Sequence, residues 1–182
     1  MKRKIALLIM ALAAISALFC LTACGQVKEA ATADNIEQLL TEQDVYCTGF
    51  TCQNDNDQYQ GGDRWKSACV HGGTLVNNTD NEYRSATIYV CGFDEDGWPV
   101  SWRFFSCVDD GDYAAELTAD DIKLAANEKS QLNYYWSNNA NPTEATQFRF
   151  IVAEAELLDG STWTNPYAED WLSIYASQKL EN

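Results

Sequence analysis

The sequence predicts a mainly β protein, an antiparallel β-sandwich of about seven strands flanked by two short helices. Apolar and polar residues alternate through residues 85–93, 100–108 and 146–157, which is the two-residue period of a strand with one buried face. These segments are rich in β-branched and aromatic residues. Turn signals such as Asp94-Glu95-Asp96-Gly97 and Asp159-Gly160 follow two of them, as expected where a chain reverses between antiparallel strands.

The first 23 residues have the pattern of a cleaved signal peptide. Three basic residues, Lys2 to Lys4, precede an apolar run over residues 5–19 that is short for a membrane span. Leu21-Thr22-Ala23-Cys24 follows, and it resembles the lipobox of bacterial lipoproteins. The resemblance implies that residues 1–23 are removed and that Cys24 receives a diacylglyceryl group and acyl chains such as palmitate. Several acyl chains would anchor the protein stably at the outer face of the cytoplasmic membrane. The other interpretation is an ordinary secretory signal with a chance cysteine.

Acidic residues dominate the charge of the chain. The net charge is −15, and it becomes −18 without residues 1–23, which carry three basic residues and no acidic one. Such a surface repels the phosphates of nucleic acids, so we expect no nucleic-acid partner. Residues 24–33 are interpreted as a linker from the lipidated cysteine. Residues 34–182 are long enough to enclose a core and are interpreted as a single domain.

Local patterns predict the elements of that domain. Asp34 to Glu42 has a capping residue followed by apolar residues at helical spacing. Gly72-Gly73 interrupts a strand-like segment, which indicates a bulge or a close approach of backbones. Asn165 as a cap and Pro166 at the first helical position open a C-terminal amphipathic helix. The expected strands are residues 45–52, 65–76, 85–93, 100–108, 130–137 and 146–157, and the expected polar segments between them include residues 53–63, 109–121 and 138–143.

The middle of the chain resembles a known class of domain. The motifs that carry the resemblance are Gly73-x-Leu75-x-Asn77, Tyr83, Ile88-x-Val90 and Phe93-Asp94-x-Asp96-Gly97. They are similar to the FxLYD-type and related immunoglobulin-like domains of Gram-positive lipoproteins. The resemblance covers about residues 72–157 and implies an immunoglobulin-like sandwich. It implies no activity, because such domains mostly have none assigned. The cysteines and the tryptophan-rich segment 100–108 depart from the usual pattern.

Five cysteines beyond Cys24 could form disulfides in an exported domain. Cys47 and Cys52 could close a tight hairpin, and Cys91 and Cys107 lie on strands expected to be neighbours. The sequence does not choose among the pairings, and the alternative is that the thiols are small buried apolar groups. The five candidates are Cys47, Cys52, Cys69, Cys91 and Cys107.

The sequence shows no recognisable catalytic or metal-binding constellation. His71 is the only histidine, and no nucleophile motif accompanies it, so we expect neither enzymatic activity nor a cofactor. Asp94 and Asp96 are weak candidates for calcium ligands, since hard oxygen ligands cluster there. Hairpin turn chemistry explains these two carboxylates better.

Aromatic residues are the feature that could carry binding. Trp98 lies on an expected hairpin tip, Tyr135 lies in a run of three aromatic residues, and Trp163 precedes the C-terminal helix. Exposed rings could stack on sugars or contact a protein, whereas buried rings would only fill the core. We therefore expect a membrane-anchored, non-catalytic interaction or structural module with a protein or glycan partner. The alternative is a carbohydrate-binding module that uses its exposed aromatics.

Overall fold

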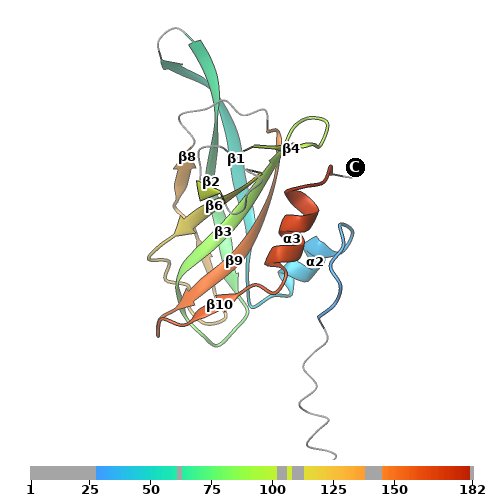
Figure 1. Ribbon diagram of the computed structural model, residues 1–182. Coiled ribbons are helices and arrows are strands. Elements are labelled where there is room, and N and C mark those ends of the chain that lie inside the picture. Colours follow the sequence, from blue (N-terminus) through green and yellow to red (C-terminus); the bar gives the residue numbers. More distant parts are fainter. Residues whose placement is uncertain (1–27, 61–62, 102–105, 108–112, 138–144, 181–182) are drawn as a thin grey trace, which may run out of the picture. The chain divides into compact units, whose positions relative to one another are not determined.

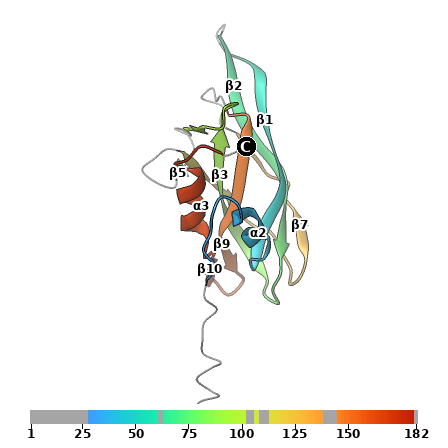
Figure 2. The same ribbon diagram turned by 90° about the vertical axis from the view of Figure 1, so that its right-hand side faces the viewer.

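The computed structural model describes residues 28–60, 63–101, 106–107, 113–137 and 145–180. The chain divides into two units, Met1–Ala30, of which residues 28–30 are described, and Ala31–Asn182. The second unit is a β-sandwich of two antiparallel sheets with two short helices (Figures 1 and 2). The predicted fold class is therefore confirmed. Within the described ranges, no helix has both the length and the apolar character of a membrane span.

Most elements of the second unit are strands, and the two helices lie near its ends. The smaller sheet has the order β1-β2-β7, with β8 also paired to β2. The larger sheet has the order β10-β9-β3-β6-β5, with β4 also paired to β3. In chain order, the elements are α2 (Ile36–Thr41), β1 (Val45–Gln60), β2 (Asp63–Asn77), β3 (Tyr83–Phe93), β4 (Pro99–Val100), β5 (Ser106–Cys107), β6 (Ala114–Ala119), β7 (Lys129–Gln131), β8 (Tyr135–Ser137), β9 (Gln147–Leu157), β10 (Thr162–Thr164) and α3 (Ala168–Tyr175).

The main core lies between the two sheets. β3 contributes the face that its alternation predicts, because Ala86, Ile88 and Val90 are all buried there. β9 contributes Phe148, Phe150 and Val152 to the same core, again as the alternation predicts. The opposite face of β3 and β9 is covered too, by a second apolar cluster under the helices. Both sides of this sheet are therefore buried where the helices lie.

Helix α3 closes the outer face of the larger sheet, beside α2 (Figure 2). Trp171 is fully buried there and packs edge-on against Tyr175, with ring centroids 5.4 Å apart. Asn165 is 3 % exposed, and its Oδ1 accepts a hydrogen bond from the Tyr167 backbone N–H at 2.9 Å. Its Nδ2 donates to the carbonyl of Val152 on β9 at 2.9 Å. Asn165 thus ties the segment before the helix to the sheet. The predicted helix start is wrong, because residues 165–168 form a turn in which the Ala168 N–H donates to the Asn165 carbonyl, so that Tyr167 is the N-cap residue and α3 begins at Ala168.

A glycine pair in β2 permits a close approach to β1. Gly72 and Gly73 have φ of +69° and +92°, in the region that disfavours side chains. The ring of Phe50 on β1 lies against Gly73, so that a Cβ at Gly73 would be 2.5 Å from Cε1 of the ring. Phe50 also stacks on Phe150 of β9 at 4.8 Å. The group that approaches Gly73 is therefore an aromatic ring and not the predicted backbone, and the β1–β2 pairing shows no bulge at Gly72-Gly73. The ring of Phe50 connects the two sheets.

Four expected segments differ in the structure. Residues 53–60 continue strand β1, and β1 and β2 pair as far as Gln60 and Asp63. Residues 130–137 contain parts of two strands, β7 and β8, which both pair with β2. Residues 100–108 include two separate strands, because β4 pairs with β3 and β5 pairs with β6. Residues 109–121 contain strand β6, whose Ala115, Leu117 and Ala119 face the core. Alanine has a low strand propensity, so the local sequence does not favour a strand here. Pairing with β3 and β5, together with burial of these side chains in the core, makes the segment a strand.

Candidate functional site

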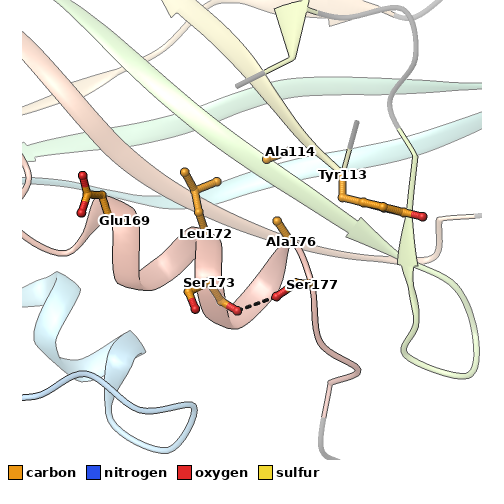
Figure 3. A pocket seen from close by; sticks show the side chains of 7 residues that line it. All are labelled: Tyr113, Ala114, Glu169, Leu172, Ser173, Ala176 and Ser177. Atoms are coloured by element: carbon orange, nitrogen blue, oxygen red, sulfur yellow. Dashed lines mark hydrogen bonds between the residues drawn. The ribbon is translucent and has the colours of Figure 1, made fainter. Parts of the chain in front are cut away.

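A groove of about 670 Å³ lies between helix α3 and the start of strand β6 (Figure 3). Its volume is within the range of small-molecule and peptide-anchoring pockets, roughly 300–1,000 Å³. We call it the α3–β6 groove. Its volume exceeds those of two other hollows in the described part of the chain, which are about 40 and 430 Å³. Its described lining residues are Tyr113, Ala114, Glu169, Leu172, Ser173, Ala176 and Ser177.

The groove exists because small side chains meet where the helix crosses the sheet. Trp171 and Tyr175 hold the buried stripe of α3 on the sheet, which turns Leu172 and Ala176 toward β6. These two residues are four apart and therefore share a helix face. Opposite them lie Ala114, whose methyl group fills little space, and Tyr113, which is 40 % exposed. The result is an apolar floor with an aromatic wall.

Ser173 and Ser177 line the groove but add little polar surface to its floor. In Figure 3, Ser173 and Ser177 lie on the side of the helix away from Ala114 and Tyr113. The Ser177 hydroxyl donates to the backbone carbonyl of Ser173 at 2.8 Å. Polar contact with an occupant of the floor would therefore come mainly from Glu169, which is exposed at the first turn of α3.

Carboxylates gather on the sheet face that carries the groove. Tyr89 and Glu116 are direct cross-strand partners on β3 and β6, on the same face as the paired Cys91 and Ala114. Burial raises the pKa of Tyr89, and the charges of Glu116 and Glu154 raise it further. Both carboxylates are therefore near the phenol. Among the described residues, no ion pair involves these two glutamates or Glu169.

The predicted hairpin tip at Asp94–Gly97 is a turn held by its own backbone and by the C-terminal segment. Asp94 Oδ1 accepts hydrogen bonds from the backbone N–H groups of Asp96 (3.0 Å) and Trp98 (2.8 Å). The Asp94 carboxylate therefore stabilises the turn, and Asp96 is exposed. Among the described residues, no group of three or more His, Cys, Asp or Glu side chains could hold a metal ion. The backbone N–H of Leu180 donates to the carbonyl of Gly97 at 2.9 Å.

Two of the three candidate stacking aromatics, Trp98 and Trp163, lie far apart. Trp98 is 55 % exposed beside the β3–β4 turn, with the Lys179 ammonium 5.5 Å from its ring centroid. Trp163 is half-buried and packs against the main core. It pairs with Ala155 of β9, whereas Phe93 at the β3–β4 turn pairs with Gln147. Eight residues along a strand span about 27 Å, so Trp98 and Trp163 lie at opposite ends of the sheet.

Tyr135 and His71 lie in the smaller sheet. The backbone of Tyr135 on β8 pairs with that of His71 on β2, and the side chain of Tyr135 is outside the described part of the structure. Tyr135 and Trp163 thus belong to different sheets. Trp98 and Trp163 therefore do not contribute to one small-ligand site, and ligand stacking by Tyr135 stays a prediction.

A second, more polar hollow of about 430 Å³ lies between α2 and the end of α3. Glu37 Oε1 accepts a hydrogen bond from the Tyr175 hydroxyl at 2.8 Å and lies 3.9 Å from Arg149 Nε. Burial raises the pKa of Tyr175, and the Glu37 carboxylate raises it further. Lys179 and Asp34 also line the hollow. Its charges are of both signs, and the central ones are paired with each other.

Two of the five candidate disulfide cysteines are free thiols, Cys47 in β1 and Cys91 in β3. Burial raises the pKa of the Cys47 thiol to about 12, with a contribution from the charge of Glu37. Burial also raises the pKa of Cys91. Both thiols are therefore protonated at neutral pH and are poor nucleophiles.

The strand pairings change two expectations about the cysteines. Cys47 and Cys52 lie in one continuous strand, so the tight hairpin expected between them is wrong. Cys91 and Cys107 are not on neighbouring strands, because β6 lies between β3 and β5. Cys52 pairs with Val70, and Gln53 pairs with Cys69, so the backbones of Cys52 and Cys69 are close. A disulfide among Cys52, Cys69 and Cys107 stays a prediction.

Sequence reasoning missed the lining of the α3–β6 groove. Leu172 and Ala176 lie beside the buried stripe of α3, and their apolar character off that stripe was the available signal. Tyr113 lies in a segment expected to be a polar loop. Its neighbour Ala114 gave no sign of being a strand residue with a helix opposite.

The comparisons with known proteins now define the class of this domain. Residues 73–178 match a family of unknown function, DUF5780, and because this is more than half of the chain, the protein belongs to that family. The chain is also similar to a hypothetical protein from Peptoclostridium difficile 630 whose X-ray structure was determined at 1.85 Å. That similarity has a TM-score of 0.50 at 12 % identity and covers 77 % of this chain and 95 % of the other, so it shows the fold alone. None of the curated proteins matches the chain.

Proposed function

We propose that the protein is a lipoprotein at the outer face of a bacterial cytoplasmic membrane, with a non-catalytic module that binds a partner in the α3–β6 groove. The observation that carries this proposal is the composition of the groove. Its described lining has an apolar floor and offers Tyr113 and Glu169 as its only titratable side chains. Acid–base or nucleophilic catalysis requires an activated group with a second group in reach, whereas binding requires a preformed apolar surface.

The anchoring part of the proposal comes from the sequence. Basic residues, an apolar run and Leu21-Thr22-Ala23-Cys24 occur in the order of a lipoprotein signal. Six residues separate Cys24 from Ala31, where the folded unit begins, and the seven Cα–Cα steps between them span at most about 25 Å. The sandwich would thus operate close to the membrane surface.

Metabolic labelling tests the anchor. Cells that express the chain are grown with an alkyne analogue of palmitate and separated into membrane and soluble fractions. We expect the label in the wild-type chain at the membrane and its loss in Cys24→Ala. Cys20→Ala is the matched control, because Cys20 lies in the segment removed on processing, and it should keep the label. Equal labelling of the Cys24→Ala chain would refute lipidation at this cysteine.

Site-specific crosslinking tests the groove as the binding surface. A photoreactive amino acid is placed at Tyr113, which forms the wall of the groove, or at Leu158, which is 59 % exposed outside it. We expect a discrete adduct from Tyr113 in intact cells, lost when Ala176→Phe fills the groove, and no such adduct from Leu158. The same adducts from both positions, or an adduct that Ala176→Phe leaves unchanged, would count against the groove.

The exposure of Trp98 supports carbohydrate binding as a second candidate function. Its ring is 55 % exposed at a turn, and exposed rings of this kind stack on sugars. Lys179 lies over the ring and would have to move or share the contact. A glycan array probed with the wild-type chain and with Trp98→Ala tests this function. Binding that Trp98→Ala abolishes supports it, and silence across cell-wall and host glycans removes it.

A further inference from the structure

We infer that the α3–β6 groove accepts a basic amphipathic segment of a protein partner, with its apolar side chains on the floor and its cationic side chains beside Glu169. This inference rests on the proposed function, which assigns binding to the groove, and adds the chemistry of the partner. Shape and charge both favour this occupant.

The shape fits a short segment of polypeptide. From Glu169 to Ser177 the helix axis advances about 12 Å, which equals three to four extended residues. Leu172 and Ala176 form an apolar floor along this length, with the Tyr113 ring as a wall (Figure 3). Apolar side chains of a partner would displace water from this floor, and aromatic rings such as Tyr113 are common anchors in protein interfaces.

The charge selects a basic segment over an acidic or neutral one. Glu169 is the only charged side chain of the described lining. Glu116 and Glu154 lie on the same face of the sheet, around Tyr89. Glu156, also on β9, is paired with Arg84, but among the described residues Glu116, Glu154 and Glu169 are in no ion pair. With a net charge of −15, the whole chain attracts cationic partners, and these carboxylates direct them to one end of the groove.

A peptide titration tests the inference directly. The full chain, in nanodiscs of zwitterionic lipid if it is recovered with membranes, is titrated into a fluorescein-labelled peptide of repeating Lys-Leu-Leu units. Peptides of Glu-Leu-Leu and Lys-Ser-Ser units are the controls for charge and for apolar contact. We expect saturable binding of the Lys-Leu-Leu peptide, weaker binding of the Lys-Ser-Ser peptide and none of the Glu-Leu-Leu peptide.

Variants then separate the groove from general attraction by a negatively charged protein. Ala176→Phe fills the floor and should weaken binding about tenfold or more. Tyr113→Ala alters only the exposed wall and provides a second variant if Ala176→Phe does not fold. Glu169→Gln should weaken binding about two- to fivefold, as expected for a charge at the rim. The matched controls, Leu158→Ala and Glu82→Gln, change an exposed apolar group and an exposed carboxylate outside the groove and should bind as the wild type does.

Equal affinity of all variants would overturn the inference, because binding would then be non-specific attraction. Absence of peptide binding, together with crosslinking from Tyr113 that Ala176→Phe abolishes, would refute the basic segment while the groove remains a binding surface. A glycan that binds wild type but not Ala176→Phe would replace the peptide as the occupant. Absence of both crosslinking and peptide binding would refute the proposed function with it.

Discussion

Replacement of Gly73 by alanine is the sharpest test of how the two sheets are joined. The new methyl group would lie 2.5–2.7 Å from three carbon atoms of the Phe50 ring. The ring has little room to withdraw, because it stacks on Phe150 at 4.8 Å and lies 6.2 Å from Trp136. The backbone of Gly73 also has φ of +92°, which an alanine adopts only with strain.

The two costs can be estimated separately. A side chain at positive φ costs about 1–2 kcal/mol. Overpacking against a ring that cannot move freely costs about 1–3 kcal/mol more. Gly73→Ala should therefore lower the free energy of unfolding by about 2–5 kcal/mol. Gly72→Ala is the matched control, because φ is +69° there and a Cβ would meet only Gln131 Nε2 at 4.0 Å. It should cost only about 1–2 kcal/mol.

Urea unfolding of the full chain, followed by tryptophan fluorescence, gives these free energies by linear extrapolation. A double-mutant cycle with Phe50→Ala isolates the overlap, since Gly73→Ala should then cost no more than Gly72→Ala does. If Gly73→Ala and Gly72→Ala destabilise equally in the wild-type background, Phe50 is not packed on Gly73 and the reasoning fails. An unchanged cost of Gly73→Ala in the Phe50→Ala background would lead to the same conclusion.

Three further predictions concern the Asn165 side chain, the turn at Asp94 and the thiol of Cys47. Asn165→Ala removes the acceptor for Tyr167 N–H and the donor to the Val152 carbonyl, both buried, and should lower the free energy of unfolding by about 2–3 kcal/mol in urea; a loss below about 0.5 kcal/mol would show that water replaces the amide. Asp94→Ala leaves two turn N–H groups without their acceptor and should cost about 1–2 kcal/mol, whereas Asp96→Asn, at an exposed carboxylate, should be nearly neutral. The pKa of Cys47 is raised to about 12 in the folded protein, compared with about 8.5 for a cysteine in the unfolded chain. The contribution of this thiol to the free energy of unfolding is therefore fully present below pH 8.5 and declines as the pH rises toward 12. Between pH 7 and pH 10, the wild type should lose about 2 kcal/mol more than Cys47→Ala in matched urea titrations, and parallel pH profiles would contradict this.

The local patterns of the sequence determined the elements whose signals are contained within a few residues. β3 and β9 follow from alternation, because a strand buries every second side chain wherever it is placed. The turn at Asp94–Gly97 follows from side-chain-to-backbone hydrogen bonds within five residues. The apolar stripe of α3 is local in the same sense. The sandwich class follows because several such strands must cover one another.

Only the tertiary structure decided which strands are neighbours. The local sequence of β6 predicts a polar loop, but pairing with β3 and β5 and burial of alternate side chains make it a strand. That insertion separates Cys91 from Cys107, which sequence order had placed on adjacent strands. Pairing and register depend on contacts between residues far apart in the chain, and no local pattern encodes them.

The candidate site belongs to the same class of non-local features. The α3–β6 groove forms where Ala176 of the last helix meets Ala114 of a middle strand, and neither residue is distinctive by itself. The separation of Trp98 from Trp163 likewise follows from their places at opposite ends of β9. The sequence by itself determined the buried faces of β3 and β9, the turn at Asp94–Gly97 and the apolar stripe of α3, because each of these features depends on neighbouring residues. The tertiary structure alone decided which surfaces stay open, because a hollow depends on how side chains from distant segments fill the space between them.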